Sequence, residues 1–384
     1  MELNRDHWKN LTDRYSQPGP RRMLALDGGG IRGLITLGIV QAIEDLVAKT
    51  TGKKRLCDYF DYIAGTSTGA IIAAGLARGM TAADLISFYT SCGNEMFEHS
   101  SLLERVKYFY TADPLRAQLQ RVFGAQTTLE PQHLQCLLLV VTKNVTTDSP
   151  WPISSNPDAR YNDPQRKDCN LKIPLWQLVR ASTAAPVFFP PEILPWDVGD
   201  PAKTFVFVDG GVTPYNNPAF LLYRMATNPA YRLNWTTGEK NLLLVSIGTG
   251  AAESLGATAA RPNKNIVSTV AELPGELMYG VQVEQDIACR TIGRCSYGAQ
   301  LDRELGNMIQ NPPPLSQDIG QKFLYIRYNA DLSAKGLAAL GFPNIDPGSI
   351  QKMDATQNIP SLIQIGAAAG KAVDASHFGD FLRT

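Results

Sequence analysis

Six short apolar runs alternate with helical segments along most of this 384-residue chain, and this alternation restricts the fold more than any other feature of the sequence. Several runs are apolar at nearly every position, which is typical of strands buried on both faces. Strands separated by helices indicate an α/β fold with a mostly parallel central sheet flanked by helices. The expected strands are 22–27, 62–67, 136–142, 204–209, 241–248 and 323–328, and the expected helices are 32–49, 68–78, 81–95, 114–122, 174–183, 217–226, 276–290 and 360–374.

The chain is expected to form one domain after a short leader. Residues 1–20 are polar and end in "QPGP", which predicts a lead-in segment before the first strand. Long loops are expected at 143–172 and 250–265, but no internal repeat and no linker divides the rest. Residues 21–384 are therefore predicted to be a single domain, and a hydrophobic content of 44% is ample for its core.

Charge and cysteine usage narrow the class of protein. Thirty-six basic residues balance 36 acidic ones without long runs of one sign, so the sequence gives no support to binding of a nucleic-acid polymer. Six scattered cysteines form no C-x-x-C pair, which favours reduced, buried thiols. Neither a secretory signal nor an apolar run long enough for a bilayer is evident, so we expect a cytoplasmic protein. No metal-ligand cluster and no cofactor are expected.

The first motif is the stretch "LALDGGGIRGL" at 24–34, where Gly28, Gly30 and Gly33 satisfy G-x-G-x-x-G between an expected strand and helix. A dinucleotide-binding loop also requires an acidic residue about 20 positions later, at the end of the second strand. The corresponding region, "LVAKTTGKKRL", contains no acid. The loop is therefore better suited to stabilise another concentrated negative charge, such as the oxyanion of an acyl-transfer intermediate.

The second motif is G-T-S-T-G, Gly65 to Gly69, again between an expected strand and helix. This is the G-x-S-x-G pattern of a nucleophile elbow, in which flanking glycines allow the sharp turn that exposes the serine hydroxyl. Ser67 would lie at the N-terminus of the next helix, where the helix dipole favours negative charge. The alternative is that Ser67 only caps that helix.

A serine nucleophile needs a base, and histidine is the usual one. None of the four histidines, His7, His99, His133 and His377, follows a late strand in a recognisable catalytic context.

The third motif offers a different base, because "TFVFVDGGV" ends an expected strand with Asp209, Gly210 and Gly211. Such an aspartate is often only a turn residue. If the strands are parallel, however, Asp27, Ser67 and Asp209 meet at one edge of the sheet.

Together these motifs resemble those of the patatin-like phospholipase family. "DGGGIRG" (27–33), "GTSTG" (65–69) and "DGG" (209–211) stand in the family's order, each after a strand. Further similarity lies in "ASTAAPVFFPP" (181–191), "YNNP" (215–218), "LLLVSIGTG" (242–250) and residues 353–371, so the resemblance covers about residues 20–375. It implies a patatin-like fold, a three-layer architecture related to that of α/β-hydrolases.

The resemblance also implies a catalytic dyad, with Ser67 as the acyl-forming nucleophile and Asp209 as the base that accepts its proton. An aspartate with an ordinary pKa near 4 is a weak base toward serine. We therefore expect partial desolvation to raise the pKa of Asp209.

Other motif residues are assigned by the same resemblance. The oxyanion hole is expected from the backbone N–H groups of Gly28, Gly29 and Gly30, with Gly29 and Gly30 favoured, and of Thr68, the residue after the nucleophile. Arg32 is a candidate for holding substrate phosphate or for fixing the loop. The remaining motif glycines are Gly65, Gly69, Gly210 and Gly211.

For the substrate, the resemblance implies fatty-acyl esters of membrane glycerophospholipids, and therefore transient contact with a membrane surface. The segment 96–115, rich in Phe, Tyr and Leu, is either a membrane-touching flap, with Phe97 and Phe109 as its test residues, or part of the core.

Some bacterial members of the family degrade the cell's own membrane in antiphage defence after a cyclic-nucleotide signal. A cyclic oligonucleotide is therefore a candidate activator, with 143–172 or 250–320 as the region expected to contribute most of its site. A housekeeping lipid acyl hydrolase and an inert binding module, in which Ser67 and Asp209 are turn residues, remain as alternatives. The oligomeric state stays open.

Overall fold

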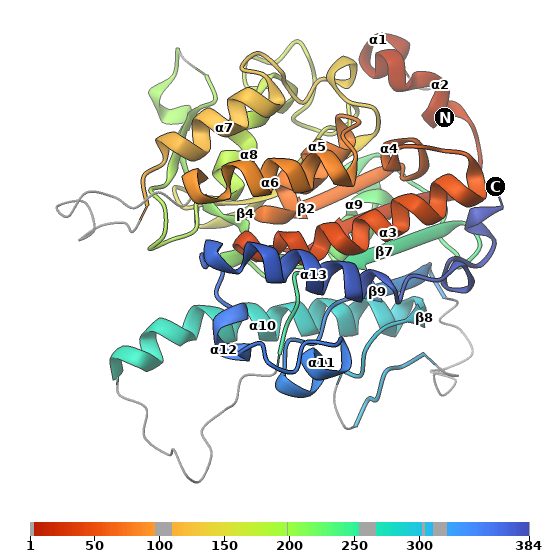
Figure 1. Ribbon diagram of the computed structural model, residues 1–384. Helices are drawn as coiled ribbons and strands as arrows, with labels where there is room; N and C mark the ends of the chain where they lie inside the picture. The colour runs from red at the N-terminus through yellow and green to blue at the C-terminus, as the bar shows by residue number, and fades with distance from the viewer. Residues whose placement is uncertain are drawn as a thin grey trace.

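Nine strands of the described chain form one mixed sheet, with helices on both faces (Figure 1). The computed structural model describes residues 4–96, 110–197, 199–252, 266–301, 304–309 and 321–383. The strands lie in the order β5-β6-β3-β2-β1-β7-β9-β8, and β4 pairs with β3. Their bounds are β1 (Arg21–Leu26), β2 (Tyr62–Thr66), β3 (Leu137–Asn144), β4 (Ser149–Ser154), β5 (Glu192–Pro195), β6 (Thr204–Asp209), β7 (Leu242–Ile247), β8 (Arg294–Tyr297) and β9 (Leu324–Tyr328).

The centre of the sheet is parallel and one side is antiparallel. β3, β2, β1, β7, β9 and β8 all run in one direction. The expectation that β6 is parallel to them is wrong, because β6 pairs antiparallel with the end of β3, with Asp209 opposite Thr142. β6 starts beyond the carboxyl end of β3 and runs back along it. Its last residue, Asp209, therefore lies at the carboxyl edge of the parallel strands.

Successive side chains of the central strands point alternately into two separate apolar layers. In β1, Leu24 and Leu26 join one core cluster, while Met23 and Ala25 join the other. This is the two-residue period of a strand buried on both faces. The three-layer α/β class predicted from the sequence is confirmed.

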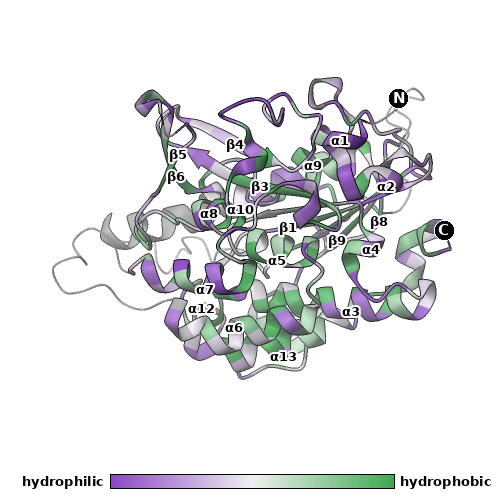
Figure 2. Ribbon diagram, turned by 90° about the horizontal axis from the view of Figure 1, so that it is seen from above, coloured by the Kyte–Doolittle hydropathy of each residue, from purple (hydrophilic) through white to green (hydrophobic). Residues whose placement is uncertain are grey.

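Two sets of helices cover the sheet. α5 (Thr68–Ala77) is buried at every residue, and Figure 2 shows hydrophobic colour along it. A helix that is apolar all round belongs in the interior. The other helices of the first core cluster are α3 (Gly33–Thr51), α4 (Leu56–Tyr59), α6 (Ala82–Met96), α7 (Asp113–Phe123), α8 (Leu175–Ser182), α11 (Ala334–Ala339), α12 (Pro347–Ile350) and α13 (Ile359–Gly370), and the second face carries α9 (Ala219–Thr227) and α10 (Ile266–Ile292).

The N-terminal segment packs into the second core cluster, whereas the sequence predicted a polar leader. It forms α1 (Arg5–Trp8) and α2 (Thr12–Ser16), and Trp8, Leu11 and Tyr15 are buried. These three residues have the spacing of one helical face, and the polar residues between them obscured it. The hydroxyl of Tyr15 also donates to the Asp61 carbonyl oxygen at 2.5 Å, which joins the segment to the start of β2.

Most predicted elements lie within a few residues of the observed ones. β4 lies inside the expected loop 143–172, while β5 and β8 were not predicted. α10 begins at residue 266 and not at 276. Most of the expected 250–265 loop, together with Phe97 and Phe109 of the expected flap, lies outside the described residues.

All six cysteines lie in the described residues and are buried and unpaired. Among the described helices, none has the length and apolar character that crossing a membrane requires.

Candidate active site

Ser67 occupies a sharp turn between β2 and α5. Its backbone angles, φ 55° and ψ −124°, are unfavourable for a residue with a side chain. The turn is possible because Gly65 and Gly69 touch: a Cβ atom at Gly65 would lie 2.0 Å from the Gly69 carbonyl oxygen. A Cβ at Gly69 would lie 2.2 Å from the carbonyl oxygen of Leu26 on β1. The motif glycines therefore allow the close packing that turns the serine hydroxyl away from the strand.

The Ser67 hydroxyl donates a 2.6 Å hydrogen bond to Oδ2 of Asp209. The other carboxylate oxygen, Oδ1, accepts the N–H of Gly211 at 2.7 Å. The turn after Asp209 packs closely against the carbonyl oxygen of Val141. This requires glycine at position 210, because a Cβ atom at Gly210 would lie 2.3 Å from that oxygen. The structure thus brings together the two residues that the sequence predicted as nucleophile and base.

Burial determines the basicity of Asp209. The residue is only 4% exposed, and desolvation raises its pKa to about 6, against the opposing effects of the two hydrogen bonds and the charge of Arg180. The direction agrees with the expectation from the sequence. A carboxylate with a pKa of about 6 is still ionised at neutral pH and is a stronger base than a solvated one.

A second Ser–Asp pair in the same chain shows what burial contributes. Ser376 donates to Asp374 at 2.6 Å, the same length as the Ser67–Asp209 bond, but this pair is exposed. There the hydrogen bonds from Ser376 lower the pKa of Asp374. The hydrogen bond alone therefore depresses basicity, and only the buried pair has a base with a raised pKa.

Residues of two elements bring backbone N–H groups into the cavity lining that also contains Ser67. Those of Gly29, Gly30 and Thr68 donate to no acceptor in the described part of the chain, and all three residues line the cavity that contains Ser67. Gly30 has φ +61°, a conformation that favours glycine. The prediction that Gly28 belongs to the oxyanion hole is wrong, because its N–H donates to the carbonyl oxygen of Asn216 at 3.1 Å.

Two charged side chains hold the glycine loop. Asp27 forms a bidentate ion pair with Arg327 of β9, at 2.9 and 2.6 Å. Arg32 donates to the carbonyl oxygens of Gly29, at 3.3 Å, and Gly250, at 3.1 Å. Of the two roles that the sequence left open for Arg32, these contacts favour fixing the loop.

Ser182 supports the elbow and was not predicted from the sequence. Its hydroxyl accepts the N–H of Ser67 at 2.9 Å and donates to the carbonyl of Val141 at 2.7 Å. It therefore ties the nucleophile to β3. The surrounding "ASTAAPVFFPP" segment supported the family resemblance, but no single residue in it carries a pattern that indicates this contact.

Arg180, two residues earlier on α8, is fully buried and was also not predicted to matter. One of its nitrogens donates to the carbonyl of Pro190 at 2.8 Å, and its Nε and Nη1 atoms have no hydrogen-bond partner among the described residues. Its charge is among those that lower the pKa of Asp209.

The described histidines take no part in the site. His133 accepts the N–H of Thr128 at 3.0 Å, and His377 contacts a tyrosine hydroxyl at 2.8 Å. His7 lies on the N-terminal helix, and His99 lies outside the described residues. In the same described part of the chain, no group of three or more His, Cys, Asp or Glu side chains is placed to hold a metal ion.

The cavity above the dyad has a volume of about 200 Å³ and mostly apolar walls. Asp209 lies in its lining together with Ser67, Gly29, Gly30 and Thr68. Such a space suits an acyl chain whose ester carbonyl reaches the serine. The apolar wall consists of Ile71, Tyr89, Leu115, Ala185, Pro186, Val187, Phe188, Phe189, Val212 and Met353.

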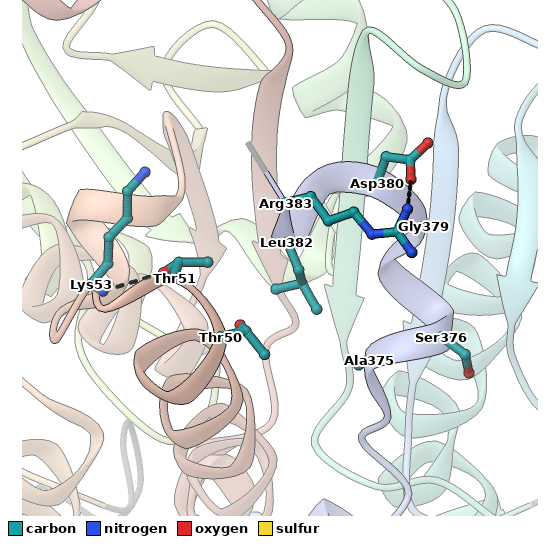
Figure 3. A pocket seen from close by; sticks show the side chains of 9 residues that line it. All are labelled: Thr50, Thr51, Lys53, Ala375, Ser376, Gly379, Asp380, Leu382 and Arg383. Atoms are coloured by element: carbon teal, nitrogen blue, oxygen red, sulfur yellow. Dashed lines mark hydrogen bonds and ion pairs between the residues drawn. The ribbon is translucent and has the colours of Figure 1, made fainter.

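Figure 3 shows another cavity, between the C-terminal end of α3 and η10 (Ala375–Leu382). Its charged side chains include Asp380 and Arg383, which pair with each other at 3.1 Å. Its hydroxyl groups include that of Ser376, which belongs to the exposed pair described above. The buried dyad lines the other cavity, which is therefore the candidate reaction site.

Comparison with known proteins identifies the family to which this α/β fold belongs. The family described as patatin-like phospholipase matches residues 24–223, more than half of the chain. The chain therefore belongs to the patatin-like phospholipase family, and its α/β sheet is the fold expected of that family.

Among curated proteins, the chain is 29% identical over 250 residues to a cGAMP-activated phospholipase of Escherichia coli strain TW11681, covering 62% of this chain and 65% of that protein. It is 30% identical over 244 residues to Patatin group M-3 of Solanum tuberosum, covering 59% and 60%. The chain thus spans less than two thirds of these relatives. A solved structure, VipD from Legionella pneumophila, aligns with 13% identity and a TM-score of 0.34, covering 90% of this chain and 67% of VipD.

Proposed function

We propose that this protein is a serine lipid acyl hydrolase that cleaves fatty-acyl esters of membrane glycerophospholipids. The observation that carries the proposal is the 2.6 Å hydrogen bond from the Ser67 hydroxyl to buried Asp209, in the lining of a mostly apolar cavity. Family membership supports the same reaction. An acyl chain would lie along the apolar wall, with its ester at the dyad.

In the proposed reaction, Oγ of Ser67 attacks the ester carbonyl carbon while its proton moves to Oδ2 of Asp209. The N–H groups of Gly29, Gly30 and Thr68 stabilise the resulting oxyanion. The tetrahedral intermediate then expels the lipid alcohol, which takes the proton from Asp209, and leaves an acyl ester on Ser67. A water molecule, deprotonated by Asp209, attacks this ester and releases the fatty acid, and the proton returns to Ser67.

Approximate free energies indicate which part of the site contributes most to catalysis. Raising the pKa of Asp209 from 3.8 to about 6 corresponds to about 3 kcal/mol of added proton affinity. A single oxyanion-hole donor contributes about 3 to 4 kcal/mol to transition-state stabilisation. With three candidate donors, the backbone N–H groups should outweigh the added basicity, so a carboxylate base can suffice without histidine.

The test is fatty-acid release from mixed phospholipid liposomes, measured by mass spectrometry. We expect Ser67→Ala and Asp209→Asn each to remove most turnover in a folded protein, because the pair acts as a unit. Ser376→Ala is the matched control, since it breaks the exposed Ser–Asp pair and should leave turnover unchanged. Wild-type turnover in folded Ser67→Ala would refute the proposal, and failure of a fluorophosphonate probe to label Ser67 would favour the inert binding module.

We further propose that a cyclic dinucleotide activates the enzyme and that it acts in antiphage defence. The name of the E. coli relative supports this regulation. The liposome assay with and without cGAMP tests it, and full activity without any nucleotide would favour a housekeeping lipid acyl hydrolase.

A further inference from the structure

Val187 combines two unfavourable features at one position. Its φ is +73°, a region that β-branched residues rarely adopt, and its side chain is 57% exposed. A glycine would take this backbone conformation without strain, and a polar side chain would be better solvated. Strain of this kind clusters at functional sites, so the apolar side chain at this point requires an explanation.

The loop around Val187 is fixed at both ends. The N–H groups of Phe188 and Phe189 both donate to the carbonyl of Ala185, at 3.1 and 2.9 Å. The carbonyl of Phe188 accepts the N–H of Tyr110 at 2.9 Å, and their rings stack with centroids 6.3 Å apart. These contacts form a tight turn over 185–189 that presents Val187 outward in a defined position.

Val212 lines the same cavity from another segment of the chain. It follows Asp209 by three residues, ends the 3-10 turn Gly210–Val212, and is 46% exposed. Val187 and Val212 both line the cavity that contains Ser67, so two of the described large exposed apolar side chains belong to one opening. We call this pair the apolar rim.

We infer that the apolar rim is the surface by which the protein rests on a phospholipid bilayer. Val187 and Val212 would enter the boundary between headgroups and acyl chains, so that a lipid chain passes into the cavity without crossing water. This inference rests on the proposed function, because it takes a membrane lipid as the substrate. Two valines bury little apolar surface, so the contact is weak and reversible.

The chemistry of the opening also predicts which bilayers it accepts. Among the described residues that line the cavity, Asp209 at the dyad is the only one with a charged side chain at neutral pH. The rim therefore offers no cation to attract anionic lipids. Binding through it should change little with salt or with the fraction of anionic lipid.

The experiment is flotation of the protein with phosphatidylcholine vesicles, in the Ser67→Ala background so that the vesicles stay intact. We expect Val187→Asp and Val212→Asp each to reduce the vesicle-bound fraction at least fivefold. Val187→Gly should also reduce binding, while its midpoint of thermal unfolding rises because the backbone strain is relieved. Weaker binding in a more stable protein would show that the Val187 side chain contacts the membrane and does not only support the fold.

The control is Tyr161→Asp, which adds the same charge at a side chain that is 51% exposed. Tyr161 follows β4, which runs antiparallel to β3 and away from the dyad. We expect this variant to bind vesicles like its parent. Equal binding by Val187→Asp, equal loss in Tyr161→Asp, or no flotation of the parent would each overturn the inference. Because binding is measured without hydrolysis, these outcomes are independent of whether the wild-type protein releases fatty acid.

Discussion

At the scale of single residues, the buried Asp209 makes activity and stability respond to pH in opposite directions. The proposed base must be ionised, so kcat/KM should fall as the pH drops through about 6. The folded-state pKa is raised above its unfolded value of 3.8, so the folded protein binds more protons between these values. Stability from this group is therefore present below pH 4 and is lost as the pH rises through about 6.

The expected size of this loss is about 3 kcal/mol in the free energy of unfolding. Because other groups also titrate, the measurement is the difference between wild type and Asp209→Asn across pH 4 to 8, by denaturant unfolding. The wild type should lose stability relative to the variant as the pH rises. A difference that does not change with pH would show that Asp209 is not desolvated.

Sequence marked Ser67 and Asp209 by their neighbouring glycines, and the family resemblance paired them. Ser67 is flanked by Gly65 and Gly69, whose roles depend on local backbone packing. Ser182 could not be predicted, since its hydrogen bond to Ser67 joins positions 115 residues apart and depends on the tertiary fold.

At the scale of elements, sequence patterns identified strands but not their directions. The apolar run of β6 predicted its bounds, 204–209, correctly. Its antiparallel direction depends on how the chain from β3 returns through β4, α8 and β5, and apolar character is the same in either direction. The N–H of Gly28 was misassigned for a related reason, because its acceptor comes from a distant segment, at Asn216.

The link between the glycine loop and β9 yields a prediction about stability. Arg327→Met leaves the carboxylate of Asp27 buried without its partner, which should cost about 3 to 5 kcal/mol in the free energy of unfolding. The double variant Asp27→Asn with Arg327→Met removes both charges and should be less destabilised than the single one. Denaturant unfolding of the single and double variants measures this, and equal stability of the two would contradict the argument.

At the scale of the whole molecule, the N-terminal segment is part of the domain's second core. Trp8 is 1% exposed, and its indole N–H donates to Asp158 at 2.9 Å, so the segment is joined to the loop after β4. Trp8 does not line the dyad cavity. Its contribution should therefore be to the stability of the fold and not to the reaction.

Trp8→Ala should lower the free energy of unfolding by about 3 to 5 kcal/mol, because it removes a large buried side chain and leaves a cavity. Asp13→Ala is the control on the same segment, since the Asp13 side chain is 84% exposed, and it should change stability by less than about 0.5 kcal/mol. Ester hydrolysis per folded molecule, measured well below the unfolding temperature, should be unchanged in both variants. A Trp8→Ala protein as stable as the wild type would mean that residues 5–16 do not belong to the cooperative fold.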